Sequence, residues 1–427
     1  MIVIIGAGLA GLSCAMQLKK KKVNYIVLEK ANSPGGYCKS YLSKGYRFDL
    51  AGHFLHFRSL KVKTLAFEIL RGRITERKRK SSILMQGARV PFPFQAHTGA
   101  LSIETNLECL VGYIRSLQKE KPKKAGNFKE WILYNFGEGM ARHFFFPYNE
   151  KFWKINLDKI LVDWTDWSIP RPTVEEVVRG AFNLKNEGLG YNPIYFYPTK
   201  GGINLLPLSL SNKVENIRYN SEVTEINSIE KLVQLRNGQK LHYEALVSTI
   251  PLPHLVQITK GLDNSLKRNA KRLSWVIVDC VQVGIDSKRI FYDDWSYIPE
   301  PKYPFCRVGK YPGSGKGTRL YVEFTRSCTS RAPHEKQLIS SAIKGLKKLK
   351  IITSEDIVDE AHMITLDPAY VVYNKWRKDV MPKITSALKR LEIFSIGRYG
   401  AWEYSSMEDA ILQGINTAES LSCGWRK

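Results

Sequence analysis

The sequence predicts an α/β fold, and three features of the chain support that prediction. An apolar run typical of a buried strand, residues 2–5, leads directly into a glycine-rich turn. Helical periodicity and aromatic residues dominate residues 61–199, for example in 103–118. Strand-like runs then recur between residues 214 and 375. This order predicts an N-terminal nucleotide-binding unit, followed by a helical insert and an antiparallel sheet.

The glycine-rich turn has the form Gly-x-Gly-x-x-Gly, made by Gly6, Gly8 and Gly11. The first glycine permits a tight turn, the second lets the main chain approach a pyrophosphate, and the third lets a helix pack on the strand. A second apolar run, residues 25–28, ends at Glu29, whose carboxylate would accept hydrogen bonds from ribose hydroxyls. Together these residues predict a Rossmann-like domain that binds a dinucleotide at a helix N-terminus.

A second pair of glycines, Gly35 and Gly36, favours FAD over a nicotinamide cofactor. FAD is longer, and its ribityl and isoalloxazine parts pass close to more of the main chain, which glycine allows. A distant segment is then expected to return to the flavin. Gly397 and Arg398, ahead of a helix-like run from Ala410 to Leu421, fit that segment because a helix N-terminus favours anions. Met407 is a further cofactor-binding candidate in this segment.

The predicted cofactor domain is discontinuous. We expect Val223 to meet the adenine end of the cofactor through its main chain. The predicted domains are an FAD-binding domain (1–60, 200–265 and 390–427), a mainly helical insert forming part of the substrate cleft (61–199), and a β-sheet substrate domain (266–389).

Composition limits the class of protein. The 427 residues carry a net charge of +25, but the short basic runs lack the aromatic interleaving of a nucleic-acid reader. The charge instead favours an anionic small substrate, with at most peripheral contact with a membrane. Seven cysteines without paired spacing argue against a disulfide framework, and no Cys/His cluster has metal-ligand spacing. With a cofactor strand at residue 2 and no long apolar stretch, a cytoplasmic location is expected.

The nucleotide motifs resemble the FAD-binding superfamily of amine oxidases, phytoene desaturases, protoporphyrinogen oxidases and UDP-galactopyranose mutases. Further elements are similar to the eukaryotic-type mutases, in the same order along nearly the whole chain. They are Pro91-Phe92-Pro93-Phe94-Gln95, Phe128-Lys129-Glu130-Trp131, Pro147-Tyr148-Asn149-Glu150-Lys151-Phe152-Trp153, Tyr191-Asn192-Pro193, Trp295-Ser296-Tyr297, Pro304-Phe305-Cys306-Arg307, Asp367-Pro368-Ala369-Tyr370 and Gly397-Arg398-Tyr399-Gly400-Ala401-Trp402-Glu403-Tyr404.

The resemblance implies a ring interconversion between the pyranose and furanose forms of a UDP- or dTDP-linked hexose, as used in polysaccharide biosynthesis. In such mutases N5 of the reduced flavin attacks the anomeric carbon and the nucleoside diphosphate leaves. The N5–sugar adduct opens through an iminium and recloses as the smaller or larger ring, and the diphosphate then returns to displace the flavin. The cycle needs reduced flavin but has no net redox change. An external reductant, such as NAD(P)H or a reductase, is therefore expected to bring the flavin into its reduced form. A homo-oligomer is also expected.

The resemblance also implies roles for individual residues. His53, Arg307 and Tyr404 are the catalytic candidates, with His53 in the loop that faces the flavin. Arg307 would pair with the diphosphate. The full set of expected substrate residues is Gln95, Asn149, Trp153, Asn192, Tyr297, Arg307, Tyr370 and Tyr404.

Two departures from the mutase pattern leave the substrate open. Ser168 stands where the pattern has a second diphosphate arginine, which Arg171 or Arg179 would have to replace. Residues 405–409 are also shorter than the corresponding loop. The alternative is an FAD-dependent oxidoreductase of the amine oxidase or desaturase type, acting on an amine, polyene or modified sugar. A third alternative is a non-catalytic flavoprotein-like scaffold that binds a partner.

Overall fold

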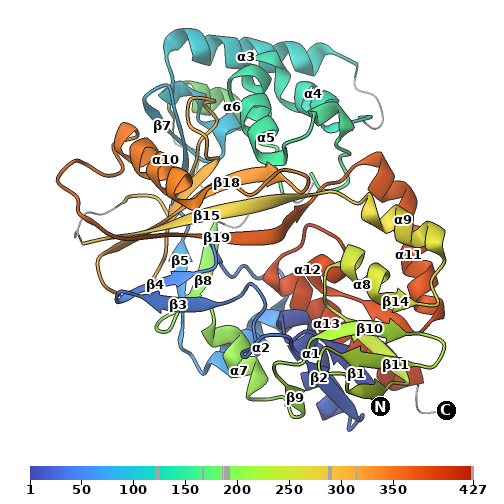
Figure 1. Ribbon diagram of the computed structural model, residues 1–427. Helices are drawn as coiled ribbons and strands as arrows, with labels where there is room; N and C mark the ends of the chain where they lie inside the picture. The colour runs from blue at the N-terminus through green and yellow to red at the C-terminus, as the bar shows by residue number, and fades with distance from the viewer. Residues whose placement is uncertain are drawn as a thin grey trace.

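The computed structural model describes residues 1–120, 125–165, 168–184, 186, 193–286, 291–313 and 315–424. Its nucleotide-binding part is built on a five-stranded parallel sheet in the order β20-β13-β1-β2-β9. These strands span Ile393–Ser395, Ala245–Ser248, Ile2–Ile5, Tyr25–Leu28 and Ile217–Arg218. The N-terminal, middle and C-terminal parts of the chain therefore lie side by side in one sheet, in the lower part of Figure 1.

Two helices from opposite ends of the chain pack together beside this sheet. They are α1 (Leu9–Lys20) and α13 (Met407–Gly424). A Cβ atom on Gly414 would lie 2.2 Å from the carbonyl oxygen of Ala10, so only glycine allows this close approach. The neighbouring short helices are α2 (Leu60–Leu70), α7 (Leu205–Ser211) and α12 (Gly397–Gly400).

A smaller sheet continues the nucleotide-binding part in the order β12-β11-β10-β14. Its strands span Lys240–His242, Leu232–Leu235, Val223–Asn227 and Thr259–Lys260. The alternating residues of 222–235 and the Asn237-Gly238 turn explain why β11 pairs antiparallel with β10 and with β12. Helices α8 (Leu252–Ile258), α9 (Asn264–Lys271) and α11 (Lys375–Arg390) lie beside it.

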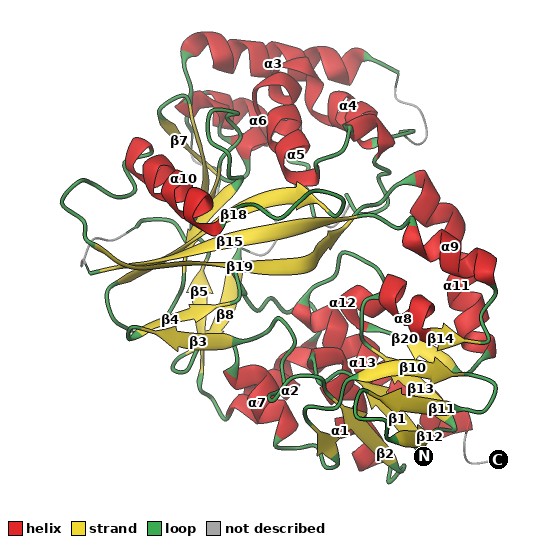
Figure 2. Ribbon diagram, in the orientation of Figure 1, coloured by secondary structure: helices red, strands yellow, loops and turns green. Residues whose placement is uncertain are grey.

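A seven-stranded sheet forms the middle layer of the molecule, in the order β19-β15-β18-β17-β16-β6-β7. Its strands span Val358–Val371, Trp275–Ile285, Thr318–Ser327, Arg307–Lys310, Trp295–Tyr297, Ser81–Met85 and Ala88–Pro91. All neighbours are antiparallel except β16 and β6. Helix α10 (Glu335–Lys348) packs on this sheet, as Figure 2 shows.

A helical layer lies beyond the large sheet, at the top of Figure 1. It consists of α3 (Ile103–Gln118), α4 (Phe128–Met140), the π-helical turn η3 (Ala141–Phe145), α5 (Phe146–Trp153), α6 (Val174–Ala181), and the 3-10 turns η1 (Phe94–Ala96), η2 (Thr98–Ala100) and η4 (Leu157–Lys159). The expected helix at 103–118 is confirmed.

The insert also contains strands that its helical periodicity did not predict. Besides β6 and β7, it includes β5 (Ile74–Lys78) and β8 (Ile194–Pro198), which pair with each other. A further hairpin, β3 (Ser40–Ser43) and β4 (Tyr46–Asp49), precedes the insert. Strand β6 pairs with β16, more than 200 residues further along the chain, so no local pattern marks its partner. In the described part of the chain no helix is long and apolar enough to cross a membrane.

Candidate functional site

The turn after β1 leaves an open space bounded by main chain. A Cβ atom on Gly8 would meet nothing within 4 Å, and one on Gly36 would meet only the Cα of Gly8, at 3.8 Å. Helix α1 has no side-chain cap, and the main-chain N–H groups of residues 9–11 have no acceptor within the helix. These donors and the positive end of the helix suit a phosphate group. A dinucleotide pyrophosphate therefore fits this turn.

Gly6 and Gly11 keep that turn closed. Gly6 has φ +99°, a conformation that favours glycine, and a Cβ atom on Gly11 would lie 2.0 Å from the carbonyl oxygen of Gly6. Gly35 joins a second loop to the turn, because its N–H donates to the carbonyl oxygen of Ala7 at 2.8 Å. The glycine-rich turn and the loop with Gly35 and Gly36, which are distant in the sequence, thus line one space.

Glu29 is buried at the end of β2 and is held by the main chain. Its carboxylate accepts hydrogen bonds from the N–H groups of Ala7, at 2.7 Å, and Ala31, at 2.9 Å. The N–H of Ser221 donates to the carbonyl oxygen of Glu29 at 2.8 Å, which brings the start of β10 and its first residue, Val223, to this edge of the sheet. These hydrogen bonds fix the orientation of the carboxylate beside the glycine-rich turn.

The C-terminal segment meets the same helix, as the sequence predicts for a return to the cofactor. A Cβ atom on Gly397 would lie 3.0 Å from the Cβ of Ala10. Arg398 donates to the carbonyl oxygens of Ala369, at 3.0 Å, and Ser405, so its guanidinium is largely engaged by the protein itself. Met407, the first residue of α13, has its sulfur 3.7 Å from the Sγ of Cys38.

His53 lies between the glycine-rich part and the large sheet. Its Nδ1 is 3.3 Å from the carbonyl oxygen of Ala51. Burial, and to a smaller extent the charges of Arg398 and Arg307, lower the pKa of the imidazole to about 4. His53 is therefore neutral near pH 7, where it can exchange hydrogen bonds but carries no charge.

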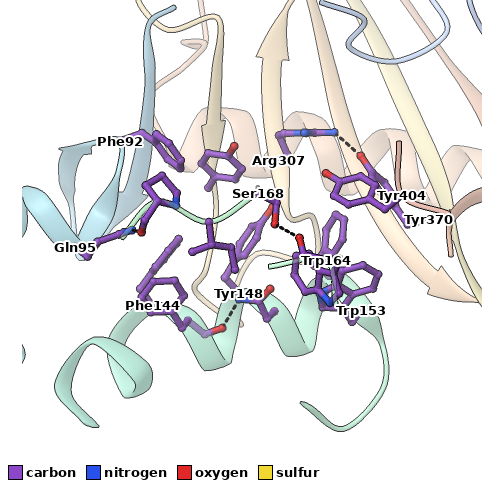
Figure 3. Close-up of a pocket in the computed structure, with 16 residues that line it drawn as sticks. Phe92, Gln95, Phe144, Tyr148, Trp153, Trp164, Ser168, Arg307, Tyr370 and Tyr404 are labelled. Atoms are coloured by element: carbon purple, nitrogen blue, oxygen red, sulfur yellow. Dashed lines mark hydrogen bonds between the residues drawn. The ribbon is translucent and has the colours of Figure 1, made fainter. Parts of the chain in front are cut away.

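A pocket opens between the large sheet and the helical layer (Figure 3). The residues expected to bind substrate meet here: Gln95, Asn149, Trp153, Tyr297, Arg307, Tyr370 and Tyr404 all line it. The remaining expected residue, Asn192, lies outside the described residues. Aromatic side chains dominate the wall: Phe92, Phe144, Phe145, Tyr148, Phe152, Trp153, Trp164, Tyr297, Tyr370 and Tyr404. The pocket suits a ligand with flat or apolar surfaces.

Arg307 is the cation among the residues that line the pocket, and it is paired with a buried acid. Its Nε and Nη2 donate to the two carboxylate oxygens of Glu323 at 2.7 and 2.8 Å. Nη2 also donates to the hydroxyl of Tyr370 at 3.1 Å, as Figure 3 shows. Burial disfavours the charged guanidinium, but Glu323 and the hydroxyls of Tyr370, Tyr321 and Tyr148 together outweigh that cost and raise the pKa of Arg307. Sequence reasoning missed Glu323, although an acid inside the apolar run of β18 signals a buried partner.

The far end of the pocket carries short polar side chains. Asn149 Nδ2 donates to the carbonyl oxygen of Phe145 at 2.8 Å, which leaves its Oδ1 toward a ligand. Gln95 donates to the carbonyl oxygen of Pro170, and Ser168 donates to that of Trp164 at 2.8 Å. Nε1 of Trp153 is buried and has no hydrogen-bond partner among the described residues. A donor without a partner is costly unless a bound molecule satisfies it.

Acids and histidines do not gather into a metal site here. Among the described residues no group of three His, Cys, Asp or Glu side chains could hold a metal ion. The described cysteines are free, and five of the seven are buried.

Comparison with known proteins defines the class. The model of the flavin-containing amine oxidoreductase family matches residues 9–422, so the chain belongs to that family, whose cofactor is FAD. The open turn at Gly8, the uncapped helix and the held Glu29 fit this cofactor.

Individual relatives differ in the chemistry that their names describe. The chain is 23% identical over 280 residues to coproporphyrinogen III oxidase of Staphylococcus aureus and 22% identical over 306 residues to protoporphyrinogen oxidase 2 of Arabidopsis thaliana. These matches cover 58% and 61% of this chain but only 60% and 59% of those proteins. The structure of a reduced UDP-galactopyranose mutase has a TM-score of 0.91 at 24% identity, covering 100% of this chain and 94% of that one. The last comparison shows a shared fold over both chains.

Proposed function

We propose that this flavoenzyme is a sugar-nucleotide mutase that interconverts pyranose and furanose rings of a UDP- or dTDP-linked hexose. The observation that carries the proposal is the convergence of seven residues, expected from distant motifs, on one pocket. The resemblance to the mutases implies that these motifs bind a nucleotide sugar. The seven residues belong to η1, α5, β16, β17, β19 and the segment before α13. The fold shared with UDP-galactopyranose mutase is compatible with this function.

Each part of such a substrate has a matching group in the pocket. The base would stack among aromatic rings near Trp153, with Asn149 and Gln95 supplying amide hydrogen bonds. The hydroxyls of Tyr297, Tyr370 and Tyr404 would donate to phosphate oxygens. Nη1 of Arg307 makes no hydrogen bond with a described residue and would reach the diphosphate, while Glu323 fixes the guanidinium plane.

The cofactor would be held by the residues around the glycine-rich turn. Gly8 and Gly36 would leave room for its pyrophosphate, and Gly6, Gly11 and Gly35 would keep the surrounding main chain close. Glu29 and the main chain of Val223 would contact its nucleoside half, and Gly397, Arg398 and Met407 would approach from the C-terminal segment. Reduced FAD supplies a nucleophilic nitrogen for the anomeric carbon. His53 is neutral near pH 7, so it would hydrogen-bond to the flavin that it faces without adding a charge.

The protein would also exclude water from the reacting sugar. Ten aromatic side chains surround the pocket, and the hydroxyls among them come from the helical layer, the large sheet and the C-terminal segment. A sugar held there is shielded on several sides, which protects a reactive anomeric centre from hydrolysis.

A second candidate, a net oxidoreductase acting on an apolar or aromatic compound, is favoured by one observation. The pocket wall is aromatic, and Arg307 already forms an ion pair with Glu323, so the pocket provides little net positive charge for two phosphates. The relatives include two proteins named as oxidases of porphyrinogens, which are large tetrapyrroles. The two candidate functions need the same fold and cofactor. They differ because the oxidoreductase oxidises or reduces its substrate overall, whereas the mutase does not.

The distinguishing experiment counts products per electron pair. The purified flavoprotein is reduced without oxygen by a limiting amount of dithionite and given a panel of UDP- and dTDP-hexoses, whose ring forms are separated by chromatography. We expect many furanose or pyranose products per electron pair, since a mutase regenerates its reduced cofactor. One product per pair, or turnover only with the oxidised enzyme and an electron acceptor, contradicts the mutase and supports the oxidoreductase.

A further inference from the structure

Helix α3 exposes an apolar stripe on the outer edge of the molecule. In Figure 1 it is the uppermost helix and runs along the rim of the helical layer. Ile103 and Leu107 are 82% and 58% exposed, and Ile114 and Leu117 are also exposed. Leu110, between them, is half-buried. The opposite face packs into the molecule through Thr105, Cys109, Tyr113 and Ser116, which are all buried.

The stripe has the spacing of a helix–helix interface. Its members, Ile103, Leu107, Leu110, Ile114 and Leu117, are separated by 4, 3, 4 and 3 residues. That alternation keeps side chains within a narrow band along one helix face, and it is the a/d pattern of coiled coils. Scattered exposed apolar residues are normal on protein surfaces, but a continuous stripe of five marks an interaction surface.

We propose that this stripe is the contact surface between two copies of the chain, formed by an antiparallel α3–α3 pair. The two-fold axis would pass beside Leu110, the middle residue of the stripe. A two-fold contact is self-complementary, so each residue of the stripe meets its counterpart at the mirrored position. Ile103 of one copy would then pack beside Leu117 of the other.

The charges beside the stripe favour this antiparallel arrangement. Glu104 and Glu108 precede Leu110 on one flank, and Arg115 follows it on the same flank. Glu104 is six residues before Leu110 and Arg115 five after it, so their distances along the axis from the centre are similar, about 9 and 7.5 Å. Antiparallel pairing therefore brings each Glu104 level with Arg115 of the other copy. The pairing occurs twice, once on each side of the two-fold axis.

The same acids disfavour a membrane as the occupant. The net charge of +25 would attract an anionic leaflet, but Glu104 and Glu108 lie directly beside the apolar stripe and would face the lipid phosphates. Glu108 is also bonded to Arg142 and His143 of its own chain, which removes those cations from the flank. A second copy, with Arg115 opposite Glu104, matches this surface better.

The proposed contact can extend beyond α3. Asn106 donates to the carbonyl oxygen of Ala181 at 2.8 Å, so the chain after α6 lies next to the first half of α3. Phe182 and Leu184, which follow, are 69% and 52% exposed. A helix of this length is about 24 Å long, less than an interface of roughly 800 Å² per partner requires by itself. We therefore expect a reversible dimer with a dissociation constant on the order of micromolar.

The first test measures oligomeric state by sedimentation equilibrium of the flavin-loaded protein at several concentrations. Wild type should show a monomer–dimer equilibrium, and Leu107→Glu should raise its dissociation constant by at least tenfold. Ile229→Glu is the matched control, because Ile229 is 81% exposed in a turn of the small sheet and should leave dimerisation unchanged. Equal flavin content in all three proteins checks that folding is intact.

A charge exchange tests the antiparallel geometry itself. Glu104→Arg and Arg115→Glu should each weaken the dimer by about threefold to tenfold. The double variant should regain most of the affinity, since the opposite charges again face each other. A wild-type protein that stays monomeric throughout, or single variants whose losses add in the double variant, would overturn the proposal. Binding of wild type but not Leu107→Glu to anionic vesicles, without a dimer, would assign the stripe to a membrane instead.

Discussion

At the scale of single residues, Gly8 gives the sharpest test of the cofactor site. Its backbone, at φ −75° and ψ 179°, suits any residue, and a Cβ there meets no protein atom within 4 Å. Gly8→Val should therefore fold normally yet fill the space that the pyrophosphate needs. We expect at least a 100-fold loss of FAD affinity, measured from the flavin absorbance retained after gel filtration. Flavin content equal to wild type would mean that the cofactor lies elsewhere.

One single and one double variant should separate the contribution of Arg307 to stability from its contribution to ligand binding. Arg307→Ala leaves a buried carboxylate without its partner and should lower the free energy of unfolding by about 3–5 kcal/mol. Adding Glu323→Gln removes that charge and should restore most of the stability. If Arg307 contacts the diphosphate, both variants should bind UDP about 1.5–3 kcal/mol more weakly. Urea unfolding reads the first effect and UDP titration the second, and UDP affinity equal to wild type in both variants would exclude Arg307 as a phosphate ligand.

His53 should make stability depend on pH in a defined window. Its pKa in the folded protein, about 4, is below the ordinary value of 6.5, so the unfolded chain binds more protons between these values. The stability is present above pH 6.5 and is lost as the pH falls toward 4. His53→Gln should reduce that loss by up to about 3 kcal/mol. Urea unfolding of both proteins at pH 4, 5 and 7 checks the difference, and parallel pH curves would contradict it.

At the scale of elements, glycines set the distance between α3 and α4. A Cβ on Gly139 would lie 2.1 Å from the carbonyl oxygen of Glu108, a main-chain atom that cannot swing away. Gly139→Ala should therefore force the helices apart and cost about 1–3 kcal/mol. Gly126→Ala is the control, because the nearest atom belongs to the flexible side chain of Glu130. Urea unfolding of the two variants should separate them, and equal stability would show that the helices adjust freely.

Sequence patterns predicted the elements whose signals are local. The alternating and apolar runs at β10, β11, β15 and β18, and the periodic helix α3, appear where the residues place them. Strands β6 and β7 were missed, since they are short and β6 is completed by the distant β16. Glu323 was missed for a related reason. Only the register of β17 with β18 places it directly opposite Arg307.

At the scale of the whole molecule, three layers bring chemistry from distant parts of the chain to one place. The parallel sheet carries the open turn at Gly8, and the large sheet carries Arg307 and Tyr370. The helical layer closes the pocket with Asn149 and Trp153 on α5. No single segment contains the site, which is why ordered motifs along the chain were needed to suggest it and packing was needed to assemble it.

The net charge of +25 gives a prediction for the molecule as a whole. A field of this sign draws anions toward the protein, and salt screens it, with a Debye length of about 10 Å at 0.1 M. The affinity for UDP should therefore fall roughly tenfold between about 0.05 and 0.5 M NaCl, if the pocket binds a nucleotide diphosphate. Uridine has the same base and ribose but no phosphate, so its affinity should change less than about twofold. Titrations of both ligands, followed by flavin fluorescence at several salt concentrations, test this prediction. Equal salt dependence for UDP and uridine would mean that the excess positive charge does not contribute to binding of the phosphates.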